Sequence, residues 1–296
     1  MTGAESQAME REPRMAQSER PLLQIENLRV DFHGRTRVTH AVRGLSLTMG
    51  REKVGIVGES GSGKSVTGRS ILKLIRPPGV MRADRMVFDG IDLLAADERQ
   101  MREIRGARIS MVLQDPKFSL NPVMRVGDQI AEAYVMHRKV SRREARRRAL
   151  EMLEAVRIRD PERVYRAWPH ELSGGMGQRV MIAMMLIPEP DLLIADEPTS
   201  ALDVTVAMQV LAIMDDLVSR RGMGLIFISH DLDLVASFCD RVVIMYAGKV
   251  MEEIEAHRLH EAKHPYTQGL LASLPRIDER REWLETLKRD PAWAED

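Results

Sequence analysis

The chain has 296 residues, which is enough for one large domain or two smaller ones. It carries 44 Lys and Arg against 44 Asp and Glu, so its net charge of zero excludes an overall basic character of the kind that binds nucleic acid. The single cysteine, Cys239, excludes an internal disulfide framework and a cysteine metal cluster. The longest apolar run, residues 180–187, is far shorter than the ~18 residues of a membrane-spanning helix. If the protein works at a membrane, we expect other subunits to span it.

The first part of the chain predicts antiparallel strands. Residues 1–20 are polar and charged without an apolar run, so we expect a disordered tail rather than a secretory signal. Residues 22–32 alternate partly between apolar and polar, and residues 41–48 form a second such run before Gly50. A short strand is predicted over residues 86–88, followed by a turn at Asp89-Gly90.

A glycine-rich loop lies between these strands. Residues 58–65 read Gly-Glu-Ser-Gly-Ser-Gly-Lys-Ser, after an apolar strand at 54–57 and before a helix predicted over 66–75. This is the P-loop pattern, in which backbone N–H groups and the helix N-terminus surround phosphate oxygens. Lys64 would reach the β- and γ-phosphates and the Ser65 hydroxyl would hold Mg²⁺. The residues expected to contact the nucleotide are Gly58, Ser60, Gly61, Ser62, Gly63, Lys64, Ser65 and Val66. A chance glycine-rich turn is disfavoured because the loop and both flanking segments agree.

A helical stretch is predicted from about residue 115 to 172. It follows a helix predicted over 97–104 and a strand at 109–113 that ends at Gln114. Within the stretch, Ser141 is predicted to cap a helix, with Glu144 completing a capping box. Five arginines between residues 142 and 148 lie mostly opposite the apolar face of this helix. We interpret them as a solvated surface rather than a nucleic-acid contact, because no aromatic residues are interleaved to stack on bases.

Strands and helices then alternate, which predicts a mostly parallel sheet and an α/β fold. Helices are expected over 174–187 and 204–220, strands over 191–195 and 224–229, and a final hairpin over 241–252. No internal repeat is visible.

Two carboxylates end the strand at 192–195. Downstream of a P-loop, Asp196 is expected to hold Mg²⁺ and Glu197 to polarise the attacking water as general base. The alternative, a strand followed by an acidic turn, is common when no P-loop precedes it.

The run Leu-Ser-Gly-Gly-Met-Gly-Gln-Arg at 172–179 resembles the signature sequence of ATP-binding cassette (ABC) ATPases. Gln114 resembles that family's Q-loop, Ser200-Ala201-Leu202-Asp203 its D-loop, and His230 its switch histidine. The resemblance covers residues 22–275 and implies a P-loop NTPase core with an antiparallel β subdomain and an inserted α-helical subdomain. It also implies that two cassettes sandwich two ATP molecules. Each nucleotide would lie between the P-loop of one chain and Ser173, Gly174 and Gly175 of the other, with Asp203 also at the nucleotide. Gln114 would bind Mg²⁺ near the γ-phosphate, and both Gln114 and His230 would take part in catalysis.

A narrower resemblance concerns the peptide importers of this family. Gln114-Asp115-Pro116 with Ser119-Leu120-Asn121-Pro122, the run 195–205, and His264-Pro265-Tyr266-Thr267 are similar to the oligopeptide and dipeptide subfamily. Nickel importers share these features. Gly177 stands where this subfamily usually has Arg or another long polar residue, and the adenine-stacking position falls on Phe32, His33 or Arg35. Many members carry a cysteine-rich segment after the His-Pro-Tyr motif, and its absence here predicts no iron–sulfur cluster.

The resemblance therefore implies an ATP- and Mg²⁺-dependent subunit of a peptide importer. We expect a nucleotide-binding domain over 21–275, with its helical part at about 115–172, and a charged C-terminal tail over 276–296. The expected partners are a second ABC ATPase, identical or paralogous, two membrane permease subunits and, indirectly, an extracytoplasmic solute-binding protein, with no nucleic acid. The protein would sit peripherally on the cytoplasmic face of the inner membrane. The alternatives are an importer of nickel or another solute, a soluble non-transport ABC ATPase, or a scaffold that binds nucleotide without hydrolysis.

Overall fold

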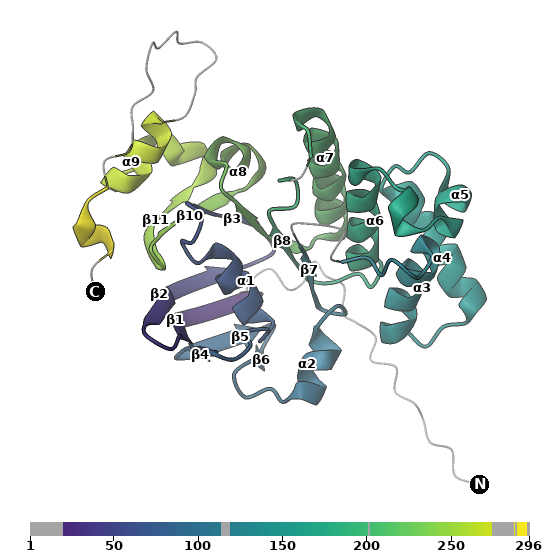
Figure 1. Ribbon diagram of the computed structural model, residues 1–296, viewed down its shortest axis with the longest axis horizontal. Coiled ribbons are helices and arrows are strands. Elements are labelled where there is room, and N and C mark those ends of the chain that lie inside the picture. The colour runs from purple at the N-terminus through teal and green to yellow at the C-terminus, as the bar shows by residue number, and fades with distance from the viewer. Residues whose placement is uncertain (1–19, 114–118, 201, 274–286, 288, 295–296) are drawn as a thin grey trace.

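A computed structural model describes residues 20–113, 119–200, 202–273, 287 and 289–294. Two β-sheets lie at the centre of the molecule, and a group of helices extends from one side of them (Figure 1). The N-terminal 19 residues predicted as a tail lie outside the described residues.

The smaller sheet has five strands and is antiparallel, as the sequence predicted. Its order is β2-β1-β5-β6, and β4 also pairs with β1. The strands are β1 Leu23–His33, β2 Val38–Met49, β4 Gly79–Arg82, β5 Arg85–Phe88 and β6 Ile91–Asp92. Strand β4 was missed in the sequence because it is four residues long and alternates only weakly; the hydrogen bonds to β1 define it.

The larger sheet has six strands in the order β11-β10-β3-β9-β8-β7. All neighbours are parallel except the hairpin of β10 and β11, which confirms the mostly parallel sheet. The strands are β3 Lys53–Gly58, β7 Ile109–Val112, β8 Leu192–Asp196, β9 Gly224–Ser229, β10 Arg241–Tyr246 and β11 Lys249–Glu255.

The helices at residues 64–71, 98–104, 142–155, 174–186 and 204–221 lie close to predicted positions. The described helices are α1 Lys64–Ile71, α2 Glu98–Ile104, α3 Val126–His137, α4 Arg142–Ala155, α5 Pro161–Arg166, α6 Gly174–Leu186, α7 Val204–Arg221, α8 Leu232–Phe238 and α9 Pro265–Ala272, with 3₁₀ turns η3 Pro169–Glu171, η4 Ala256–Glu261 and η5 Pro291–Ala294. Helix α1 ends four residues before the predicted Ile75, and Lys73 just beyond it has a left-handed φ of 50°. Helix α8 was not predicted; the Asp231 side chain caps it by accepting a hydrogen bond from the Leu234 N–H.

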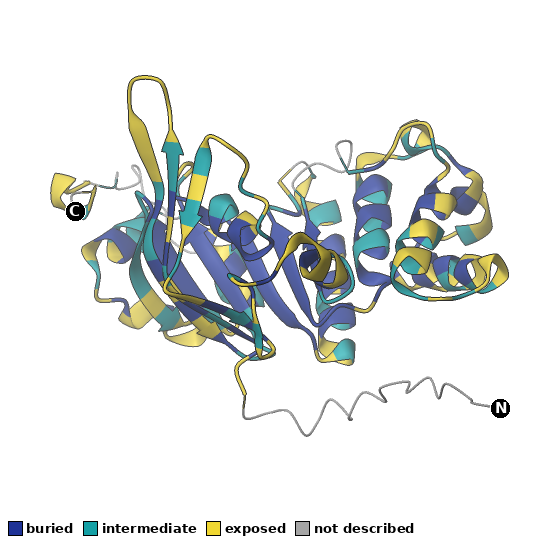
Figure 2. Ribbon diagram, turned by 90° about the horizontal axis from the view of Figure 1, so that it is seen from below, coloured by how far each residue is buried: buried dark blue, intermediate teal, exposed yellow. Residues whose placement is uncertain are grey.

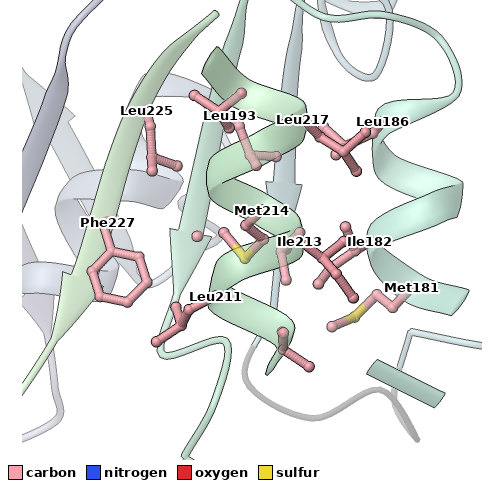
Figure 3. Packing of buried hydrophobic residues seen from close by; sticks show 14 of the residues in the cluster. Met181, Ile182, Leu186, Leu193, Leu211, Ile213, Met214, Leu217, Leu225 and Phe227 are labelled. Carbon is pink, nitrogen blue, oxygen red and sulfur yellow. The ribbon is translucent and has the colours of Figure 1, made fainter. Parts of the chain in front are cut away.

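Each parallel strand contributes to two hydrophobic clusters, because successive side chains point to opposite faces of a sheet. In β9, Ile226 and Ile228 face the antiparallel sheet and α1, whereas Leu225 and Phe227 face α6 and α7. Figure 3 shows the cluster that contains Leu225 and Phe227, where side chains of β8 and β9 meet those of α7 and α6. The parallel strands β3, β7, β8, β9 and β10 are accordingly almost entirely buried (Figure 2).

Helices α3, α4 and α5 pack together beside α6 and lie within the stretch that the sequence predicted as helical. Ser141 caps α4 by accepting a hydrogen bond from the Glu144 N–H at 3.2 Å. The capping box is a correction: the Glu144 carboxylate instead accepts hydrogen bonds from Arg147 one turn along the helix. Within the part of the chain that the structure describes, no helix is long and apolar enough to span a bilayer.

Candidate nucleotide site

The candidate site lies where three parallel strands end side by side. Strands β3, β9 and β8 are adjacent in the sheet, and their carboxyl ends carry Gly58, Ser229 and Asp196. Ligands of open α/β sheets bind outside these strand ends. The topology therefore brings the P-loop, the acidic pair and the residues after β9 to one edge.

The P-loop needs its glycines. Gly61 and Gly63 have φ of 83° and 100°, in the left-handed region that favours glycine. A Cβ at Gly63 would also lie 2.3 Å from the carbonyl oxygen of Ala41 in β2. Gly63 is the N-cap of α1 and offers no side-chain hydrogen bond, so the first N–H groups of α1 are left for an anion.

Lys64 lies buried inside this loop. Its Nζ donates hydrogen bonds to the carbonyl oxygens of Gly58 at 2.7 Å and Glu59 at 2.8 Å. Burial lowers the pKa of Lys64, against the nearby negative charges of Glu197, Asp196 and Glu59, which raise it. A phosphate group would supply the opposing charge that favours the ammonium form.

Asp196 and Ser65 meet at the end of β8. The Ser65 hydroxyl donates a hydrogen bond to Asp196 Oδ1 at 2.7 Å. Burial raises the pKa of Asp196, and the bond from Ser65 opposes that shift. A hydroxyl and a carboxylate beside a phosphate site are hard oxygen donors, and Mg²⁺ commonly takes one or two of these from the protein. The residues present therefore fit a magnesium ion.

Glu197 turns away from the strand direction, with a left-handed φ of 47°. Its N–H donates a hydrogen bond to the Ile228 carbonyl of β9 at 2.9 Å, which fixes this turn. Its Oε1 lies 3.3 Å from His230 Nδ1; the Glu197 side chain is 20% exposed and that of His230 is 63% exposed. Glu197 and His230, two of the three predicted catalytic residues, are therefore in contact at the mouth of the site.

A pocket of about 390 Å³ joins these parts. It is lined by Ala41, Ser60, Gly61, Gly63, Lys64, Ser65, Val66 and Glu197. Ala41 was missed in the sequence, where nothing distinguishes it from other residues of its strand. Ser62, also predicted to contact nucleotide, is buried, and its hydroxyl has no hydrogen-bond partner within the described residues.

The signature residues lie elsewhere. Ser173 is the N-cap of α6 and accepts a hydrogen bond from the Met176 N–H at 3.4 Å, and both Ser173 and Gly174 are exposed. A Cβ at Gly175 would lie 2.5 Å from Cγ1 of Val206 in α7, so this glycine allows the two helix starts to pack closely. Neither these residues nor the exposed Asp203, which caps α7, lines the P-loop pocket.

Two further sequence expectations have different outcomes. Gln114 lies outside the described residues, so its place relative to Asp196 stays a prediction. Of the adenine-stacking candidates, Phe32 packs partly buried against the cluster between the two sheets, and His33 and Arg35 are exposed. None of the three lines the P-loop pocket.

Comparisons with known proteins agree with this architecture. Residues 42–200 match the family model described as ABC transporter, and residues 251–296 match the model described as oligopeptide/dipeptide transporter, C-terminal region. The chain is 51% identical to a probable peptide ABC transporter ATP-binding protein, y4tR, of Sinorhizobium fredii, over 88% of this chain and 78% of that protein. It is 47% identical to the oligopeptide transport ATP-binding protein OppD of Bacillus subtilis, over 88% of this chain and 74% of that one.

Solved structures give the same fold. The dimeric post-hydrolysis ATP-binding cassette MJ0796, bound to ADP and Pi, superposes with a TM-score of 0.71 at 27% identity, over 79% of this chain and 98% of that one. CbiO1 of Clostridium perfringens, part of the ABC transporter complex cbiONQ, superposes with a TM-score of 0.70 at 27% identity, over 86% and 96% of the two chains. The protein therefore belongs to the ABC transporter family and is an ATPase subunit of that family.

Proposed function

We propose that this ATPase energises the import of peptides through separate membrane subunits. One observation carries the choice of cargo: residues 251–296, beyond the nucleotide-binding core, match the C-terminal region of oligopeptide/dipeptide transporters. The relatives at 47–51% identity have names that specify peptide, oligopeptide or dipeptide transport. The sequence motifs that nickel importers share with this group make nickel the competing cargo.

The geometry supports a direct in-line hydrolysis of ATP. The N–H groups of the P-loop and of α1 bind the phosphates, and Lys64 moves its hydrogen bonds from the loop carbonyls to the β- and γ-phosphates. Ser65 and Asp196 would hold Mg²⁺, which when bound neutralises charge on the phosphates. Glu197, at the mouth of the pocket, accepts a proton from the attacking water as general base.

His230 is proposed to orient this reaction rather than to act as the base. Its ring contacts the Glu197 carboxylate through Nδ1 and is largely exposed, so Nε2 is free to approach the γ-phosphate. Fixing the carboxylate and the water in one geometry lowers the entropic cost of the attack.

The site is proposed to work only in a pair of cassettes. Ser173 and Gly174 are exposed at the N-terminus of α6, Gly175 is partly buried, and none of the three lines the pocket of its own chain, so a second ATPase would bring its phosphates to them. The partner is an identical or a paralogous chain. Two permease subunits and an extracytoplasmic solute-binding protein complete the proposed importer, which places this subunit on the cytoplasmic face of the inner membrane.

The surface for the permeases is proposed at residues 115–124, at the start of the predicted helical stretch, of which the structure describes residues 119–124. Val123 in this stretch is 76% exposed, so its apolar side chain is available to contact a partner. Cys239 is buried and burial raises its pKa to about 12, so a cysteine introduced at Val123 would be the only reactive thiol. Val123→Cys should crosslink to the membrane subunits in a manner that changes with ATP. Crosslinking confined to a matched Arg143→Cys in α4 would contradict this surface.

Uptake tests the cargo. Cells that lack their own peptide importers and express this chain with its permeases and binding protein should accumulate a radiolabelled oligopeptide. Replacing this chain by its Glu197→Gln variant should abolish the uptake. Accumulation of ⁶³Ni²⁺ without peptide would assign the chain to the competing cargo, and phosphate release without any uptake would favour a non-transport ATPase.

A further inference from the structure

The last described residues of the chain return to the P-loop. Arg289 donates hydrogen bonds from Nε and Nη2 to Oε1 of Glu59, at 3.3 and 3.1 Å. Glu59 is the second residue of the loop, and its carbonyl oxygen accepts a hydrogen bond from Lys64. Residues 230 positions apart in the sequence therefore form an ion pair at the phosphate-binding loop.

Trp293 anchors this segment to the core. Its ring lies edge-on to Tyr246 of β10, with centroids 6.2 Å apart at 90°, and 5.8 Å from Tyr266 at 71°. His264 lies 5.6 Å from the same ring. Figure 1 shows the resulting position of the C-terminal turn η5, in yellow, beside α9. Edge-to-face aromatic pairs of this kind hold a segment in one orientation.

A second connection reaches the other half of the loop. Arg43 of β2 donates a hydrogen bond from Nη1 to the Ala294 carbonyl at 2.6 Å. The Arg43 N–H donates to the Gly248 carbonyl at 2.8 Å, and the Gly248 N–H donates to the Ser62 carbonyl at 3.1 Å. The C-terminal segment is thus linked to the loop at both Glu59 and Ser62.

Tyr266 approaches Glu59 from α9. The Tyr266 side chain is fully buried, and burial together with the negative charge of Glu59 raises its pKa to about 12. Glu59 therefore lies near the phenol group of Tyr266 and pairs with the Arg289 guanidinium.

The charges in the loop suggest a role for the ion pair of Arg289 with Glu59. Glu59 is the only acidic residue in the loop sequence 58–65, and a nucleoside triphosphate brings several negative charges into the same loop. Unpaired, the Glu59 carboxylate would repel the phosphates. We propose that residues 287 and 289–294 form a C-terminal clamp that positions the P-loop, in which Arg289 offsets the charge of Glu59 when nucleotide binds. Arg289 is a positioning residue, because it acts through Glu59, and the inference rests on the proposed ATP site.

Nucleotide binding by the purified full-length chain tests the clamp. The probe is the non-hydrolysable analogue AMP-PNP with Mg²⁺, titrated by calorimetry at low salt. Arg289→Gln should raise Kd by about two- to fivefold, the size typical of an exposed ion pair, and Arg289→Lys should restore most of the affinity. In a Glu59→Gln background, Arg289→Gln should have no further effect, because the charge that it offsets is gone. Trp293→Ala should raise Kd as Arg289→Gln does, since the clamp loses its anchor.

Arg258→Gln is the matched control. Arg258 is 54% exposed against 56% for Arg289, and it pairs with Glu261 in the same C-terminal region but away from the loop. It should leave Kd unchanged, and thermal unfolding should show all variants folded. Wild-type affinity in Arg289→Gln, or an equal loss in the Glu59→Gln background, would overturn the clamp. Failure of the wild-type chain to bind AMP-PNP would contradict the ATP site itself and the clamp with it.

Discussion

Two helices of this protein begin with glycine-rich segments, and the two N-termini differ in their surroundings and in their caps. Helix α1 begins inside the P-loop pocket, its N-cap Gly63 offers no side-chain hydrogen bond, and Lys64 at its first position is buried. Helix α6 begins at the surface, and Ser173 caps it with a hydrogen bond to the Met176 N–H. The first start has no side-chain cap, whereas Ser173 satisfies one N–H group of the second start within its own chain.

The difference divides the proposed site between chains. Strand ends of the parallel sheet bring Lys64, Ser65, Asp196, Glu197 and His230 together in one chain. Ser173, Gly174 and Gly175 at the start of α6 do not line that pocket. Substitutions in the first group should therefore act on the chain that carries them, and substitutions in the second on its partner.

The largest effect is expected for Glu197→Gln. It keeps the size of the side chain but removes the charge that accepts a proton, so hydrolysis should fall by about 10²–10⁴-fold. Nucleotide binding should survive, because Lys64, Ser65 and the loop amides are unchanged. Phosphate release with membrane partners present measures the fall in hydrolysis. Size-exclusion chromatography with ATP and Mg²⁺ measures whether nucleotide-bound chains still pair. Near wild-type turnover would show that the base is another residue.

Mixing two inactive variants tests whether the N-termini of α1 and α6 that form one site come from different chains. A Lys64→Ala chain and a Ser173→Arg chain should each be inactive alone. Mixed pairs contain one intact site, made from the wild-type P-loop of one chain and the wild-type signature of the other, so the mixture should recover about a quarter of the wild-type rate. If the working pair is made with a paralogous ATPase, that partner is supplied first. No recovery where wild-type chains hydrolyse ATP would contradict assembly between chains.

A smaller effect is expected for Ser173→Ala, and Ser141 provides its control. Both serines are exposed N-caps, of α6 and α4, with hydrogen bonds of 3.4 and 3.2 Å. Either Ala variant should lose about 0.5–1 kcal/mol of stability with its cap. Only Ser173→Ala should also reduce the phosphate release of paired cassettes, by about 10- to 100-fold, because it removes a hydrogen-bond donor to the partner's charged γ-phosphate. Equal activity in the two variants would make Ser173 a cap alone.

Sequence patterns were sufficient where the chemistry is local. The P-loop, the acidic pair at the end of β8 and the cap of α4 each occupy a few consecutive residues, and the apolar runs before the P-loop and the acidic pair matched the observed strands. Helix α8 was missed because seven residues carry too little periodicity, although Asp231 is a recognisable cap. Ala41 and the pair of Arg289 with Glu59 could not be found, since they depend on how β2 and the C-terminal segment pack against the loop.

The smallest expected effect concerns the thermal stability of the protein, through Asp196 beside the P-loop. Burial raises the pKa of Asp196, which means that ionising this carboxyl group costs more free energy in the folded protein without ligand than in the unfolded chain. A group with a raised folded pKa stabilises the fold only at low pH, and this contribution is lost as pH rises through that pKa. Asp196→Asn, which can still accept the Ser65 hydrogen bond, should therefore raise the Tm of the nucleotide-free chain at neutral pH by about 1–3 °C. The gain should shrink as pH falls and wild-type Asp196 becomes neutral, and Mg²⁺ with ATP should stabilise only the wild-type chain strongly. Calorimetric scans of both chains, with and without Mg-ATP, measure this. A lower Tm for Asp196→Asn at neutral pH would contradict this prediction, because it would show that the Asp196 carboxylate stabilises the nucleotide-free protein.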